Sequence, residues 1–149
     1  MDFPALPPWP CASPPTALVE GLGAAPTAVW QVADNYFAIY DSEEDVRRIR
    51  PDFRVLETLH PAGVAITAPG GSCDFVSRYF APSYGIPEDP VTGSTHCSLT
   101  PYWAQRLGKV RLHARQISQR GGELWCEMHG ERVVLQGNAV LVLRGELLI

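Results

Sequence analysis

The sequence lacks any long apolar stretch. No unbroken apolar run is longer than that from Ala139 to Leu143, whereas a helix needs about 20 such residues to cross a bilayer. The N-terminus is rich in proline and carries no apolar segment of the kind found in signal peptides. We therefore expect no membrane partner and a cytoplasmic location.

A surplus of positive charge is also missing. The 12 lysines and arginines stand against 16 aspartates and glutamates, a net charge of −4, and the two signs are scattered along the chain. Domains that bind nucleic acid usually carry a basic patch or stripe. We therefore expect no nucleic acid partner, and a small anion would have to be bound by local donors.

The sequence shows no metal-binding or hydrolase motif. Its four cysteines form neither a CxxC pair nor a spacing typical of zinc ligands. They are Cys11, Cys73, Cys97 and Cys126. A zinc site built on His96 and Cys97 would lack that spacing too, and without a GxSxG motif a serine hydrolase is disfavoured. We expect no metal site, and thiols that stay reduced.

Length and composition predict one α+β domain. A chain of 149 residues with 46% apolar content can bury a single core, and two full domains would not fit. The density of proline in residues 1–15 forbids a helix and predicts an extended arm, with Asp2 to Leu6 as an edge strand. Residues 16–149 then form the domain itself.

Helix signals mark three places before residue 60. Thr16 to Leu22 is a short helix that ends at Gly23. Ser42 to Asp45 resembles a capping box in which aspartate replaces the usual glutamate, so a helix begins there. Pro51 interrupts that helix, and a second short one is expected to run to about Leu59. The arginines of this region, Arg47, Arg48 and Arg50, are most simply a solvated helix face.

Strand signals occupy much of the remaining chain. Thr27 to Ala33 and Tyr36 to Tyr40 predict a hairpin, and Gly63 to Ala68 with Asp74 to Phe80 predict an antiparallel pair. Alternating side chains then indicate strands over 109–115, 123–129 and 132–136. Ala139 to Leu143 is apolar at every position, so we expect a central strand that is covered on both faces.

The region from Tyr84 to Gly108 reads as an irregular loop that leads into a helix. Its apolar positions, Leu99, Tyr102, Trp103 and Leu107, fit one helix face that ends at Gly108. Pro101 lies inside this pattern, which predicts either one bent helix or a restart with Thr100 as the new N-cap. The start of the first helical segment is an expected anion site, because its backbone N–H groups have no partner within the helix.

Several side chains around this helix start are candidates for chemistry. Gly93 would let a ligand approach the backbone, and Thr92 or Ser94 could cap the helix or donate to a ligand. Asp89 and its neighbour Glu88 supply carboxylates, although an Asp-Pro pair often does no more than begin a turn. His96 is a candidate contact that is more often a packed helix histidine than an acid or base.

Two segments carry a family resemblance. Arg78 to Lys109 (RYFAPSYGIPEDPVTGSTHCSLTPYWAQRLGK), followed by Gln116 to Gly122 (QISQRGG), closely resembles the second half of PhzF-like proteins, the phenazine-biosynthesis isomerases that share their fold with diaminopimelate epimerase. The resemblance implies a barrel-like mixed sheet around a central helix, and it makes residues 16–149 a C-terminal lobe. Residues 1–15 then resemble the crossing between lobes.

The same resemblance implies a function. Family members have two lobes with the active site between them, and their catalytic glutamate lies in the first lobe, which has no counterpart here. It implies that Asp89 is catalytic, that Thr92, Gly93, Ser94 and His96 bind a small carboxylate-bearing metabolite, and that no cofactor is needed. A homodimer or a separately encoded first lobe would complete the cleft. The alternative is a binding module without catalysis.

Overall fold

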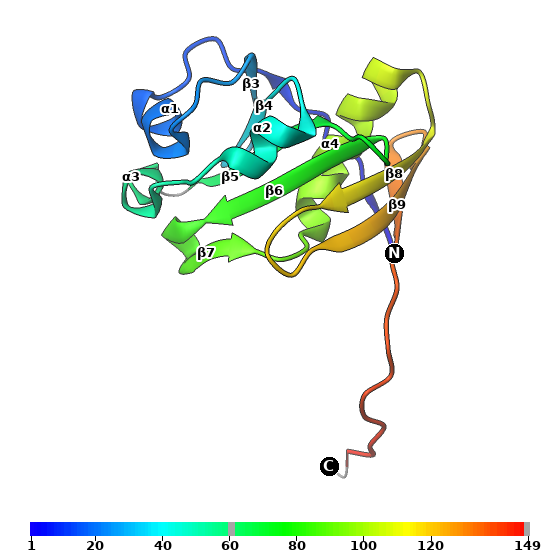
Figure 1. The fold of residues 1–149 in the computed structure, drawn as a ribbon. Helices are drawn as coiled ribbons and strands as arrows, with labels where there is room; N and C mark the ends of the chain where they lie inside the picture. The colour runs from blue at the N-terminus through cyan, green and yellow to red at the C-terminus, as the bar shows by residue number, and fades with distance from the viewer. Residues whose placement is uncertain (60–61, 148–149) are drawn as a thin grey trace.

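The structure is a computed structural model that describes residues 1–59 and 62–147. Within these residues ten strands form one sheet in the order β1-β10-β9-β8-β6-β5-β4-β3-β2, with β7 paired to β6 at one side (Figure 1). The strands are β1 (Asp2–Pro4), β2 (Trp9–Pro10), β3 (Ala28–Val32), β4 (Asn35–Ile39), β5 (Gly63–Pro69), β6 (Phe75–Ala81), β7 (Ile86–Asp89), β8 (Arg111–Gln116), β9 (Gly122–His129) and β10 (Arg132–Gln136). The β4–β5 and β6–β8 pairs are parallel and the others antiparallel, so the sheet is mixed.

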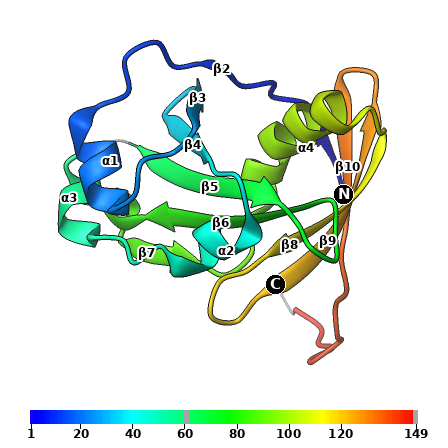
Figure 2. The ribbon, with the colours of Figure 1, turned by 45° about the horizontal axis from the view of Figure 1, so that its top comes forward.

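The helices lie on both sides of this sheet. They are α1 (Thr16–Leu22), α2 (Glu43–Arg48), α3 (Phe53–Glu57), the short 3-10 helix η1 (Pro82–Tyr84) and α4 (Gly93–Leu107). In Figure 2, α1, α2 and α3 lie on one side of β5 and β6, whereas α4 lies on the other, where the sheet curves around it. The predicted α+β class with a half-barrel sheet around a central helix is confirmed.

Alternation along β6 explains the two layers. Val76 and Phe80 point into the core beneath α1 to α3, whereas Phe75 points into the core around α4 and stacks on Trp103 at 5.6 Å between ring centroids. Because successive side chains of a strand face opposite sides, one strand serves both cores. Both faces of β5 and β6 are therefore buried.

The local signals before residue 60 were read correctly. Gly23 caps α1 in the left-handed conformation. The Ser42 hydroxyl accepts from the Asp45 N–H and donates to the Asp45 carboxylate, which is the predicted capping box at the start of α2. The hairpin also forms, but its turn lies at Ala33 and Asp34, one residue earlier than predicted. Ala33 adopts a φ of 45° there.

Helix α4 is continuous through Pro101, so the restart at Thr100 is wrong. Proline lacks the N–H that would bond to the Cys97 carbonyl one turn earlier. That carbonyl instead accepts the backbone N–H of Leu6, from the N-terminal arm, at 2.9 Å. The proline is thus tolerated because the arm takes over the freed acceptor.

The proline-rich arm is part of the sheet. It contributes β1, which is a terminal strand as expected, and β2, which lies at the other end. Between them the arm crosses α4 through the Leu6 hydrogen bond. The N-terminal ammonium also donates to the Leu135 carbonyl at 2.8 Å, so the arm is fixed at both ends.

Three sequence expectations are corrected. Residues 86–89, expected in an irregular loop, form β7 against β6 next to a register shift at Phe80 and Ala81. Leu107, expected on the buried face of α4, is exposed, because it lies in the last turn, beyond the sheet. Ala139 to Leu143 form no strand, since no strand of the described chain lies beside them.

No helix within the described residues is long and apolar enough to span a membrane. All four cysteines are free thiols, and Cys97 and Cys126 are buried.

Candidate anion site at the start of helix α4

The loop between β7 and α4 is held by residues of the β8–β9 connection. Gln116, buried at the end of β8, accepts the Thr92 N–H at 2.9 Å through its Oε1. Its Nε2 donates to the Asp89 carbonyl at 2.7 Å and to the Thr92 hydroxyl at 3.1 Å. Ser118 donates to the Pro90 carbonyl at 2.9 Å. Side chains from the QISQRGG segment therefore fix the shape of the EDPVTGS segment.

A close approach completes this clamp. A Cβ atom built on Gly122 would lie 2.2 Å from Val91 Cγ2, which is closer than atoms can approach. Only glycine therefore lets the start of β9 pack against the loop.

Asp89 stands at the end of β7, opposite Tyr79. The Thr92 hydroxyl donates to its Oδ2 at 2.5 Å. The Tyr79 hydroxyl donates to Asn35 Oδ1 at 2.8 Å, and burial, with the nearby Tyr84 and Asp89, raises the pKa of Tyr79 to about 12. Asp89 thus lies beside a neutral phenol and is oriented by Thr92.

Glu88 has a structural partner. Arg78 forms a two-pronged ion pair with it, at 2.8 Å from Nε to Oε1 and 3.0 Å from Nη2 to Oε2. The same guanidinium donates to the carbonyls of Val46 and Ile49 at the end of α2. Of the two neighbouring carboxylates, Asp89 is therefore the one free of an arginine partner.

The first turn of α4 supplies the expected donors. Thr92 is the N-cap residue, but its hydroxyl does not cap the helix, because it is bonded to Asp89. Ser94 is exposed and Gly93 half-buried, and their backbone N–H groups meet no acceptor in the described part of the chain. Such groups, with the helix dipole, favour an anion by about 0.3–1 kcal/mol.

His96 lies beneath the helix start. Its ring is fully buried, its Nδ1 is 2.7 Å from the Thr92 carbonyl, and it packs on Phe75. Because a carbonyl only accepts, Nδ1 carries the proton. Burial lowers the pKa of His96 to about 4, so the ring is neutral at pH 7. The residue supports the loop from within and presents no surface to a ligand.

A pocket of about 480 Å³ opens beside this helix start. It is lined by Met1, Val91, Gly93, residues 120–124 and residues 135–138. Arg120 brings an exposed guanidinium next to Gly93, so a cation and a helix N-terminus face the same space. Asp89 and Ser94 do not line this pocket, and the structure places them beside it.

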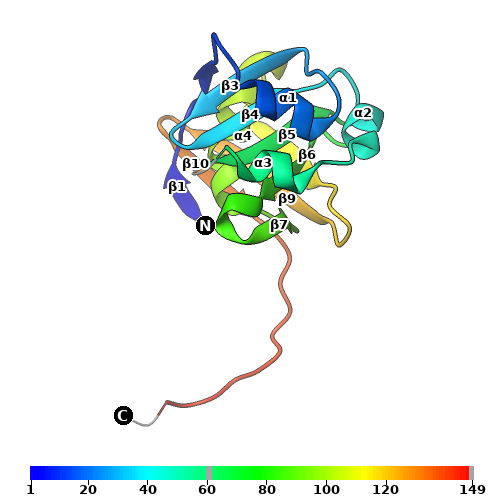
Figure 3. The same ribbon diagram turned by 90° about the vertical axis from the view of Figure 1, so that its left-hand side faces the viewer.

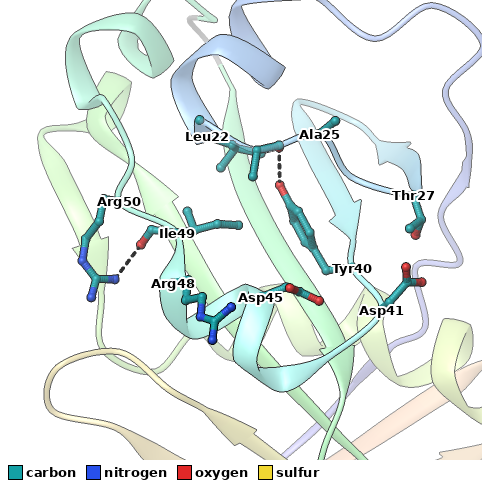
Figure 4. Close-up of a pocket in the computed structure, with 11 residues that line it drawn as sticks. Leu22, Ala25, Thr27, Tyr40, Asp41, Asp45, Arg48, Ile49 and Arg50 are labelled. Atoms are coloured by element: carbon teal, nitrogen blue, oxygen red, sulfur yellow. Dashed lines mark hydrogen bonds between the residues drawn. The ribbon is translucent and has the colours of Figure 1, made fainter.

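A second pocket, of about 540 Å³, lies elsewhere in the fold, between α1 and α2 (Figure 4). Its wall includes Tyr40, whose hydroxyl donates to the Ala24 carbonyl at 2.9 Å, together with Asp41 and Asp45. Asp45 is bound to Ser42 by the capping box. None of the predicted site residues lines this pocket.

Sequence reasoning placed the helix start and Asp89 but missed what holds them. Gln116 and Ser118 belong to a segment that was singled out only for its resemblance, and no local pattern shows that they reach a loop more than 20 residues away. Arg120 was noted only as a possible contact with a partner. A buried glutamine at the end of a strand was the one available signal, since such an amide needs polar partners.

The curved sheet with α4 inside it defines a lobe of the PhzF and diaminopimelate epimerase fold class. A crystal structure of a PhzF-family phenazine biosynthesis protein from Enterococcus faecalis superimposes with a TM-score of 0.90 and 40% identity, over 100% of this chain and 57% of that one. A similar structure from Clostridium difficile gives a TM-score of 0.88 and 38% identity, over 100% of this chain and 57% of that one.

Sequence comparison agrees with this class. The phenazine biosynthesis-like protein model (PhzC-PhzF) matches residues 15–145, and the chain belongs to that family. It is 52% identical to Uncharacterized isomerase PA3578 of Pseudomonas aeruginosa over 147 residues, which cover 99% of this chain and 56% of that protein. The human phenazine biosynthesis-like domain-containing protein is 53% identical over 83 residues, which cover 53% of this chain and 29% of that protein. The chain thus spans little more than half the length of the bacterial relatives it matches.

Proposed function

We propose that this chain is one wall of a PhzF-like isomerase site that binds a small carboxylate at the start of α4. The observation that supports it most is the clamp from Gln116 to Asp89 and Thr92, which holds a carboxylate beside unpaired helix N–H groups. The N–H groups of Gly93 and Ser94, with Arg120 nearby, bind the acid group of the substrate.

In this proposal Asp89 moves a proton. Its carboxylate takes a proton from a substrate carbon near the bound acid group, and the electron pair left on that carbon shifts toward the substrate. The same carboxyl group then returns the proton at another carbon or on the other face. The substrate is rearranged without any change in its oxidation state.

The site is completed by a second polypeptide, either another copy of this chain or a separately encoded first lobe. An enzyme site of this kind excludes water, whereas the pocket at Gly93 is bounded here on one side only. The family resemblance places the catalytic glutamate in the other lobe.

A binding module without catalysis is the second candidate. It is favoured by the span of the chain, which covers 56% of its relative PA3578 and so matches only part of that family member. Such a module would keep the anion-binding helix start and use Asp89 only to orient the ligand.

Deuterium exchange separates the two functions. Small amino and hydroxy acids are incubated with the protein in D₂O, and loss of carbon-bound protons and ligand binding are both followed by NMR. We expect exchange with the parent protein and none with Asp89→Asn, while Asp41→Asn, in the second pocket, behaves like the parent. Binding without exchange in every protein would identify a binding module, and absence of binding would refute both functions.

A further inference from the structure

The chain beyond β10 leaves the body of the protein. Residues 137–147 form neither helix nor strand and run away from the sheet in Figures 1 and 3. Val140, Leu141, Val142 and Leu143 are 73 to 91% exposed, and Leu147 is 82% exposed. Valine and leucine runs favour buried strands, so this tail, residues 139–147, has the composition of a core strand without its cover.

Both faces of the tail require cover. In an extended chain Val140 and Val142 face one side, and Leu141 and Leu143 face the other. Docking on a flat surface would bury only one of these pairs. Insertion into a sheet that is covered on both sides buries both pairs.

The sheet edges of the described chain are poor acceptors for such a strand. The terminal strands β1 and β2 and the side strand β7 are two to four residues long. Each contains a proline, Pro4, Pro10 or Pro87, which has no N–H to give to a ladder. A second copy would offer the same three edges, so the acceptor is a different folded body.

We propose that the tail is a β-strand of the complementary half, the part of the family's length that this chain does not match. That half is available in the relatives, since the chain covers 57% of the E. faecalis structure and 56% of PA3578. The main chain of the tail supplies hydrogen bonds, and its four central side chains fill the core of the partner.

This arrangement also places the partner at the anion site. Gly137 and Asn138, at the base of the tail, line the pocket that contains Gly93. A body that binds residues 139–147 therefore lies against the mouth of that pocket and closes it. The inference rests on the proposed function only in giving this closure a role, because strand insertion itself needs no ligand.

The test is complementation with a defined probe. The part of PA3578 that this chain does not match is co-expressed with the chain, and the same part co-expressed with its own remainder controls for its folding. We expect a one-to-one complex in light scattering and slow amide exchange at residues 139–147. Val140→Asp combined with Val142→Asp should weaken the complex at least about 100-fold.

Controls keep the result clear. Glu146→Gln, in the same tail, should change the affinity by less than about twofold. The double variant should unfold at the same denaturant concentration as the parent, since both side chains are exposed in the free chain. Failure to form the complex, or a complex that the double variant leaves intact, overturns the proposal. A homodimer that the double variant dissociates also overturns it and assigns the tail to a second copy. These outcomes are read without ligand, so they are independent of the exchange experiment.

Discussion

The amide nitrogen of Gln116 lies 2.7 Å from the backbone oxygen of Asp89, and this bond joins residues 27 positions apart. Gln116 is paired in the sheet with Ser77 of β6 and is almost fully buried. The loop that carries Asp89 is therefore fixed by the rigid part of the sheet and not by its own turn residues. Any account of the site has to include this glutamine.

Replacing Gln116 should loosen the loop. In Gln116→Ala the buried Thr92 N–H loses its acceptor and the Asp89 carbonyl loses a donor, so we expect unfolding to require about 2 kcal/mol less. Urea denaturation measures the difference. Gln119→Ala makes the same change at an exposed position of the same segment, and it should alter the free energy of unfolding by less than about 0.5 kcal/mol. Equal stability of both variants would show that the clamp is not needed for folding.

The Arg78–Glu88 pair should be important for stability. Arg78 is 11% exposed and also holds two carbonyls at the end of α2, so Arg78→Ala leaves a partly buried carboxylate and two acceptors unpaired. We expect a loss of about 3 kcal/mol in the free energy of unfolding. Arg48→Ala removes an exposed pair with Glu44 and should cost under about 0.5 kcal/mol. Comparable losses in the two variants would contradict this reading.

Two glycines near the site should respond in opposite ways. Gly122→Ala places a methyl group against Val91 and should destabilise the protein by about 1–3 kcal/mol. Nothing lies within 4 Å of the corresponding position on Gly93, so Gly93→Ala should fold as stably as the parent.

Ligand binding gives the second readout for Gly93. Its added methyl group would stand in the pocket at the helix start, so we expect carboxylate affinity to fall about tenfold at unchanged stability. NMR titration with the acid that binds the parent measures this. Unchanged affinity in Gly93→Ala would move the ligand away from the helix start.

Local signals in the sequence predicted most helices and strands, because caps, turns and alternation are short-range. The errors arise where distant partners decide. Strand β7, with the sequence IPED, has little strand propensity and exists because β6 offers it a backbone edge. Pro101 stays inside α4 because the N–H of Leu6, from the N-terminal arm, donates to Cys97 in place of the missing helix bond.

The tail shows the converse case. Its pattern predicts a strand covered on both faces, and that pattern reports what the segment requires but not where its partner lies. For the site, the positions of Asp89 and Gly93 follow from the sequence and the family resemblance. The burial of His96 and the reach of Gln116 follow only from the packing of β6, β8 and α4.

The buried His96 should make stability depend on pH. Its pKa is about 4 in the folded protein and 6.5 in the unfolded chain, so between these values the unfolded state binds a proton that the folded state does not. The stability from the neutral ring is fully present above about pH 6.5 and is lost as the pH falls toward 4. The shift corresponds to a total loss of about 3 kcal/mol.

The measurement compares urea unfolding at pH 7 and pH 4.5. Carboxylates such as Asp74, whose pKa is lowered by Lys109 and the His113 N–H against the opposing effect of burial, also destabilise the fold in acid, so the contribution of His96 is read as a difference. We expect the parent to lose about 2 kcal/mol more than His96→Gln, which has no group to titrate in this range. His129→Gln, at an exposed position, should lose as much as the parent. If His96→Gln lost stability in parallel with the parent, the ring beneath the helix start would have to be hydrated or already charged, and the support it gives to Thr92 would need another explanation.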